Sequence, residues 1–163
     1  MDSRDILTIK GLIRRGEART ASSYNNIPLD RVHFLDLPFY ETGKIQKNPI
    51  SEADVEIVRN LLREVKPHQI FVAGDLADPH GTHRVCTDAV FAAVDLEKEE
   101  GAKWLKDCRI WMYRGAWAEW EIENIEMAVP ISPEELRAKR NSILKHQSQM
   151  ESAPFLGCLL YTS

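Results

Sequence analysis

Two aspartates and two histidines lie within nine residues of this sequence, and these residue types suit metal-assisted hydrolysis. Asp75 and Asp78 precede His80 and His83, and the two histidines are three residues apart. Imidazoles at this spacing can face one point, and a nearby carboxylate can hold one ring through its second nitrogen. The simpler interpretation is that His80 caps a turn and His83 is an exposed first-turn residue. A rival metal interpretation adds Cys86, but the sequence offers no second pair of soft ligands.

The elements around this cluster place it at the end of a predicted buried strand. Residues 69–73 are short and mostly apolar, and Gly74 begins a loop that cannot continue the strand. Thr82 can cap a following helix, whose last residues, 97–100, form a charged run typical of a solvated end. Ligands of open α/β sheets bind beyond the carboxyl ends of the strands. The sequence therefore predicts that the chemistry lies in this loop.

Helical and strand patterns alternate along the rest of the chain. This alternation implies right-handed crossovers onto one mostly parallel sheet that helices cover on both faces. The predicted fold class is α/β, with a three-layer, Rossmann-like arrangement in a single domain. The further helices are expected at residues 3–24, between Ser51 and Pro67, and from Ser132 to about His146, and the further strands at residues 31–37, 108–113 and 125–129. Ser51 with Asp54, and Ser132 with Glu135, predict capping boxes at the starts of two of these helices, and Pro133 suits a first helical position.

Composition and charge exclude several classes of protein. The chain has 163 residues and a net charge of −4, and its lysines and arginines are spread along the sequence, which argues against a nucleic-acid partner. No apolar run approaches the ~20 residues of a transmembrane helix, and the first residues lack the order of a secretory signal. Three cysteines without a C-x-x-C pattern suit a reducing compartment. We therefore expect a cytoplasmic protein without a membrane partner.

An aromatic tract follows the predicted strand at residues 108–113. Trp117 or Trp120 could offer an apolar plate to a sugar ring, and Arg114 could contact a phosphate or a hydroxyl group. The alternative, favoured by the usual role of aromatic side chains at strand ends, is that the tryptophans pack a core or anchor a loop.

Three motifs in order resemble the PIG-L/LmbE family of zinc-dependent N-acetylglucosaminyl deacetylases. They are the segment at residues 74–83, an earlier Arg14-x-x-Glu17, and a closing stretch from Lys139 to the His146-Gln147-Ser148-Gln149 sequence. The resemblance spans roughly residues 9–149. It is strongest to the deacetylase-like rear half of bacterial proteins whose front half resembles glucosamine-6-phosphate deaminase.

The resemblance implies roles for particular residues. His83 would be a zinc ligand, His80 would face the developing oxyanion, and Asp78 is the carboxylate candidate for catalysis. Arg14 would face the substrate, and His146 would lie beside the site. The implied mechanism is zinc hydrolysis, in which the metal lowers the pKa of its water, an aspartate takes the proton and a histidine helps to hold the oxyanion.

The sequence departs from this family at both ends. The family's first motif, His-Pro-Asp-Asp, is absent, so the chain is expected to begin downstream of the first strand and to be inactive alone. Residues 1–157 are assigned to a partial deacetylase domain, and residues 158–163 to a non-native tail, because a DNA sequence that would encode them resembles a sequencing adapter. The alternative for this tail is a short natural strand. The alternative to a hydrolase fragment is a non-catalytic sugar-binding or oligomerisation module of a glucosamine-6-phosphate deaminase-like enzyme. The missing part of the domain, and a fused deaminase-like domain, are the expected partners besides an amino sugar.

Overall fold

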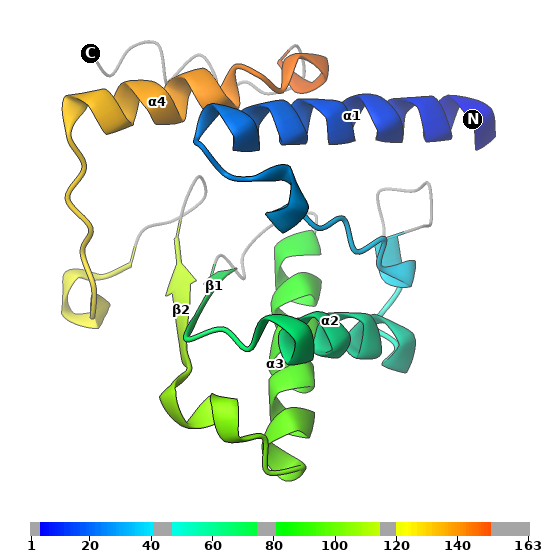
Figure 1. Cartoon of the computed structure of the whole chain (residues 1–163), viewed down its shortest axis with the longest axis vertical. Coiled ribbons are helices and arrows are strands. Elements are labelled where there is room, and N and C mark those ends of the chain that lie inside the picture. The colour runs from blue at the N-terminus through cyan, green and yellow to red at the C-terminus, as the bar shows by residue number, and fades with distance from the viewer. Residues whose placement is uncertain (1–3, 41–46, 75–80, 115–119, 151–163) are drawn as a thin grey trace. The chain divides into compact units, whose positions relative to one another are not determined.

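The computed structural model describes residues 4–40, 47–74, 81–114 and 120–150, and the chain divides into two units (Figure 1). Unit 1 comprises Met1–Phe34 and Glu126–Ser163, and unit 2 comprises Leu35–Ile125. The predicted tail at residues 158–163 lies outside the described residues. Along the parts of the chain that the structure describes, no helix is long and apolar enough to cross a membrane.

Unit 2 is built on two packed helices, α2 (Glu52–Val65) and α3 (Thr82–Glu99). The predicted capping box starts α2: the Ser51 side chain accepts from the Asp54 amide, and the Asp54 carboxylate accepts from the Ser51 amide. Lys66, in the left-handed region at φ 48°, ends this helix just before Pro67. The core between the helices consists of Val58, Leu62, Ala89 and Ala93.

A small parallel sheet completes the secondary structure of unit 2. β1 (Gln69–Ala73) pairs with β2 (Arg109–Tyr113) in a register that sets Ile70 opposite Ile110 and Ala73 opposite Tyr113. Ile70 packs against the helical core, which fixes one face of the sheet. The α/β class is confirmed. The described residues form this two-stranded sheet and not the larger three-layer arrangement predicted from the sequence.

Two predicted strands are wrong. Within residues 31–37, Arg31 ends a 3-10 turn and Asp36 has a φ of 49°, which extended strands do not accommodate. Leu35 and Leu37 nevertheless pack against the core, so their apolar character reflects burial in irregular backbone. Residues 125–129 have no strand partner and are exposed. The 3-10 helices of the described chain are η1 (Leu29–Arg31), η2 (Pro38–Tyr40), η3 (Lys103–Asp107), η4 (Ile122–Asn124) and η5 (Gln147–Gln149).

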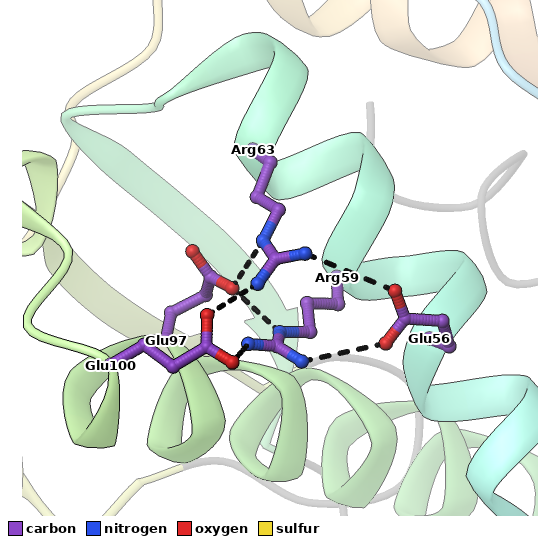
Figure 2. Close-up of polar contacts among 5 residues, drawn as sticks. All are labelled: Glu56, Arg59, Arg63, Glu97 and Glu100. Atoms are coloured by element: carbon purple, nitrogen blue, oxygen red, sulfur yellow. Dashed lines mark hydrogen bonds and ion pairs between the residues drawn. The ribbon is translucent and has the colours of Figure 1, made fainter.

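An ion-pair network joins α3 to α2 (Figure 2). The prediction that the charged run at residues 97–100 is a solvated helix end is wrong for Glu97. Glu97, expected at a solvated end, is 3% exposed and lies between Arg59 and Arg63. Its Oε1 accepts from the Nε of each arginine at 2.6 Å. Glu100 pairs with the same two arginines, and Glu56 approaches them from the other side. The charged run therefore binds the two helices together.

Unit 1 consists mainly of two helices that lie side by side, α1 (Arg4–Tyr24) and α4 (Pro133–Ile143). As predicted, α4 starts with a capping box, formed by Ser132 and Glu135, and with a proline at its first turn. Asn25 donates through its Nδ2 to the Ser142 Oγ at 2.6 Å, and Asn141 donates to the Tyr24 hydroxyl at 2.9 Å. These bonds join the carboxyl ends of both helices.

Candidate functional site

The carboxyl ends of β1 and β2 meet in a contact that requires a glycine. The Gly74 amide donates to the Tyr113 carbonyl at 2.7 Å, which extends the parallel pairing by one residue. A Cβ atom at position 74 would lie 2.9 Å from the Met112 Cβ and 2.9 Å from the Trp120 Cζ2. Glycine is the residue that permits such an approach. The loop of the predicted chemistry begins directly after it.

Arg114 directly follows β2, at the strand ends where Gly74 lies. Its guanidinium carbon lies 4.0 Å from the ring centroid of Trp120, a cation–π contact. The Trp120 indole is itself anchored, because its Nε1 donates to the Met112 carbonyl at 3.1 Å. The Arg114 Nε is buried and has no hydrogen-bond partner among the residues that the structure describes. A buried donor without a partner is costly, so this nitrogen is suited to bind a group supplied by a ligand.

His83 lies in the first turn of α3, above the end of β1. One helical turn later, the buried Thr87 donates through its Oγ1 to the Ala73 carbonyl at 2.8 Å, which ties this helix face to the strand end. Residues four apart share a helix face, so exposed His83 lies on the side that meets β1. The helix does not begin as predicted: Gly81, at φ 69°, is its N-cap, and Thr82 is its first residue.

The remaining residues of the predicted cluster, Asp75, Asp78 and His80, lie outside the described residues, as does Trp117. Among the residues that the structure describes, no group of three or more histidines, cysteines, aspartates and glutamates could hold a metal ion. His83 alone of the described residues carries over from the predicted metal site. The described residues on their own therefore do not fit a zinc site.

The two outer motifs of the predicted site meet in unit 1, although they are more than a hundred residues apart. The Glu17 carboxylate of α1 accepts from the Ser148 amide and from the Ser148 hydroxyl, each at 2.6 Å. Hydrogen bonds from Ser148 lower the pKa of Glu17, and the charges of His146 and Arg14 act in the same direction. Arg14 is exposed and His146 is half-buried. The structure thus joins Arg14-x-x-Glu17 to the closing motif.

Thr87 and Gly74 are positioning residues that sequence reasoning missed. The signal for Gly74 was present, because a glycine at the end of a strand often marks a close approach of backbone. The bond of Thr87 to a strand end depends on how α3 packs, so it has no signature in the sequence. Trp120 anchors the end of β2. This is the structural role that was predicted from the sequence as the alternative to sugar binding.

Comparison with known proteins shows the family of the chain. Residues 4–94 match the family described as PIG-L: GlcNAc-PI de-N-acetylase. The chain is 99% identical over 157 residues to a Bacteroides thetaiotaomicron protein described as glucosamine-6-phosphate deaminase-like, a match that covers 96% of this chain. The chain spans 24% of the length of that relative, which is a much larger protein. No solved structure matches. Because the match covers more than half of its residues, the chain belongs to the PIG-L family.

Proposed function

We propose that this chain is part of an amidohydrolase that removes the N-acetyl group from an amino sugar of the N-acetylglucosamine type. The observation that carries the proposal is the family match, which includes β1, Gly74 and the start of α3 with His83. The arrangement at the strand ends supports it, because ligands of parallel sheets bind there. The activity belongs to the longer protein, and we expect the 163 residues alone to be inactive.

The proposed cofactor is zinc, with His83 as one ligand and with Asp78 and His80 as the catalytic residues. A catalytic zinc site needs about three protein ligands and an open position for water. His83 is the one proposed ligand that lies among the described residues. The other ligands would come from the loop at residues 75–80 or from parts of the longer protein beyond this chain.

The proposed substrate contacts are Arg14, Arg114, Trp117 and His146. Arg114 is the best supported of these by geometry, since its guanidinium is held on Trp120 and its buried Nε has no partner within the described parts of the chain. An arginine held in this way suits a phosphate oxygen or a sugar hydroxyl. A phosphorylated amino sugar would use the positive charge as well as the donor.

Acetate release by the full-length Bacteroides thetaiotaomicron relative tests the function. We expect the relative to release acetate from N-acetylglucosamine or its 6-phosphate, with loss of activity after zinc removal and recovery when zinc returns. His83→Ala at the matching position should abolish this activity. His68→Ala is the matched control, because His68 is exposed and precedes β1 at the opposite end of the strand. Failure of the intact relative on every N-acetylated amino sugar would contradict the proposal.

Arg114→Gln in the same relative tests the substrate contact. We expect the KM for a 6-phosphorylated substrate to rise about tenfold, the loss of ~1.4 kcal/mol expected for a hydrogen bond to a charged group. The KM for the unphosphorylated sugar should change less. Arg109→Gln is the control, since Arg109 is exposed at the other end of β2. If both variants raise the KM for the 6-phosphorylated substrate equally, Arg114 is not a substrate contact.

A second candidate function is a non-catalytic sugar-binding or oligomerisation module of a glucosamine-6-phosphate deaminase-like enzyme. The observation that favours it is that the described residues hold no group able to bind a metal. It predicts that the intact relative binds an amino sugar without zinc and that His83→Ala changes neither binding nor activity. Zinc analysis of the purified relative, with and without His83→Ala, separates the two functions.

A further inference from the structure

Unit 2 contains a cavity of about 640 Å³ that is open to solvent, at the end of the sheet opposite to Gly74. The carboxyl-terminal part of α3, the 3-10 helix η3 and the start of β2 surround it. Its volume lies within the range of about 300–1,000 Å³ that is typical of small-molecule sites. Neither the family match nor the proposed deacetylation gives this cavity a role.

The charged residues that line the cavity are all basic. Lys98, Lys103 and Lys106 line it, and none of its described lining residues is an aspartate or a glutamate. The nearby acidic side chains of α3, Glu97 and Glu100, pair instead with the arginines of α2 (Figure 2). The ion-pair network therefore holds these two carboxylates beside α2, and the charged residues that line the cavity are lysines. Such a site concentrates anions.

The lining between the lysines is apolar. Val94, Leu105 and Ile110 contribute to it, from α3, η3 and β2 respectively. An apolar lining with a few charged groups is the usual composition of a site for a small organic molecule. The three lysines of the lining can together supply the positive charge that matches a doubly charged phosphate monoester, whereas a carboxylate carries a single charge. We propose that this cavity binds a small organic phosphate whose non-phosphate part is apolar.

Titration of the full 163-residue chain with hexyl phosphate tests the proposal by calorimetry. We expect saturable binding with one site per chain, and binding that weakens as sodium chloride is raised, because salt screens the lysines. Inorganic phosphate, which lacks the apolar part, and hexyl glucoside, which lacks the charge, should each bind at least about tenfold more weakly. Equal binding of inorganic phosphate or of hexyl glucoside, or no binding of hexyl phosphate, overturns the proposal.

Variants identify where the ligand binds. Lys103→Gln combined with Lys106→Gln should weaken hexyl phosphate binding about tenfold or more. Lys139→Gln is the control, because Lys139 is an exposed lysine of α4 in unit 1. Circular dichroism spectra and melting curves show whether each variant folds. If the folded double variant binds as the wild type does, the cavity is not the site.

Cysteine modification gives a second readout that needs no variant. Cys108 is a half-buried free thiol that lines the cavity, whereas Cys86 is an exposed free thiol of α3 that is not part of the lining. Hexyl phosphate should slow the alkylation of Cys108 by iodoacetamide severalfold and leave the rate at Cys86 unchanged, as measured by peptide mass spectrometry. Equal slowing at both cysteines, or slowing at neither, contradicts the proposal. The result is independent of any deacetylase activity.

Discussion

At the scale of single residues, Glu97 is the side chain on which the contact between α2 and α3 depends. It is buried, and it accepts hydrogen bonds from both Arg59 and Arg63. Removing one partner of a buried ion pair is strongly destabilising, because the other charge stays buried. Glu100 still compensates Arg59 in part, which moderates the loss.

Glu97→Gln should therefore lower the melting temperature of the chain by roughly 5 °C. The control is Glu134→Gln, which removes an exposed pair with Arg137 and should change the melting temperature by no more than about 1–2 °C. Thermal melts followed by circular dichroism measure both. Similar shifts in the two variants would show that the buried network contributes no more than a surface pair.

Acid should destabilise the protein through the same carboxylate and through Asp54. Burial raises the pKa of Glu97, but the hydrogen bonds from Arg59 and Arg63 outweigh it, so the net pKa is lowered from 4.5. Burial of Asp54 is likewise outweighed by bonds from Ser51 and Phe39, and its pKa is lowered from 3.8. Stability from groups with a lowered pKa is present above the unfolded value and is lost as pH falls through the folded value.

The melting temperature should accordingly hold down to about pH 4.5 and fall at lower pH. Glu97→Gln should flatten the upper part of that decline, because the variant side chain does not titrate. Melts between pH 3 and pH 7 measure both curves. A melting temperature that rises as the pH is lowered from 5 to 3 would contradict the assignment.

The sequence predicted residue types better than their contacts. The resemblance implied that Arg14 and His146 belong to one site, and the structure joins their two motifs through Glu17 and Ser148. The burial of Glu97 was not predicted. A charged run is normally interpreted as exposed to solvent, and the sequence does not show which arginines face it. Burial of a charge depends on tertiary packing, which a local pattern does not report.

At the scale of elements, Gly74 and Gly16 give substitutions with opposite expected signs. A Cβ at Gly74 would lie 2.9 Å from Met112 and Trp120, whereas a Cβ at Gly16 would meet nothing within 4 Å. Gly74→Ala should destabilise the chain by about 1–3 kcal/mol through overpacking. Gly16→Ala, within the helix α1, should stabilise it by about 0.5–1 kcal/mol.

Urea unfolding curves of the two glycine variants measure these changes in free energy. Gly74→Ala should in addition change the near-ultraviolet circular dichroism, because it moves the Trp120 ring off the strand end. Stabilisation by both substitutions would show that the close approach at Gly74 relaxes without cost.

Helices were predictable from the sequence, and isolated strands were not. Each helix carries its own signals, such as the capping boxes at Ser51 and Ser132, and the helices α1 to α4 lie close to their predicted ranges. A strand needs a partner, which a short apolar run does not specify. The strands predicted at residues 69–73 and 108–113 pair with each other. Residues 31–37 and 125–129 have no such pairing in the structure.

At the scale of the whole molecule, large apolar side chains remain exposed in both units. Leu12 of α1 is 62% exposed, Phe71 of β1 is 56% exposed and Ile122 of η4 is 86% exposed. Exposed apolar surface of this kind commonly marks contacts with other chains or with other parts of a longer chain. This agrees with a relative of which the chain spans 24%.

The 163-residue chain should therefore self-associate in a concentration-dependent way, as sedimentation velocity would show. Ile9→Lys combined with Leu12→Lys should weaken the association, because both residues are exposed on one face of α1. Asn60→Lys combined with Gln69→Lys, at two exposed polar positions of unit 2, is the control for added charge. A sharp cooperative melt from a monomer at all concentrations would count against the prediction.

The division of the chain into units has a consequence for its synthesis. Unit 1 is formed by two segments that flank unit 2 in the sequence, and its bond between Glu17 and Ser148 joins residues 131 positions apart. At translation rates of about 5–20 residues per second, α1 leaves the ribosome roughly 7–26 seconds before that partner exists. Unit 2 is continuous and can fold during this interval. The order of emergence thus makes α1, with its apolar side chains uncovered, the part of the nascent chain most in need of a chaperone.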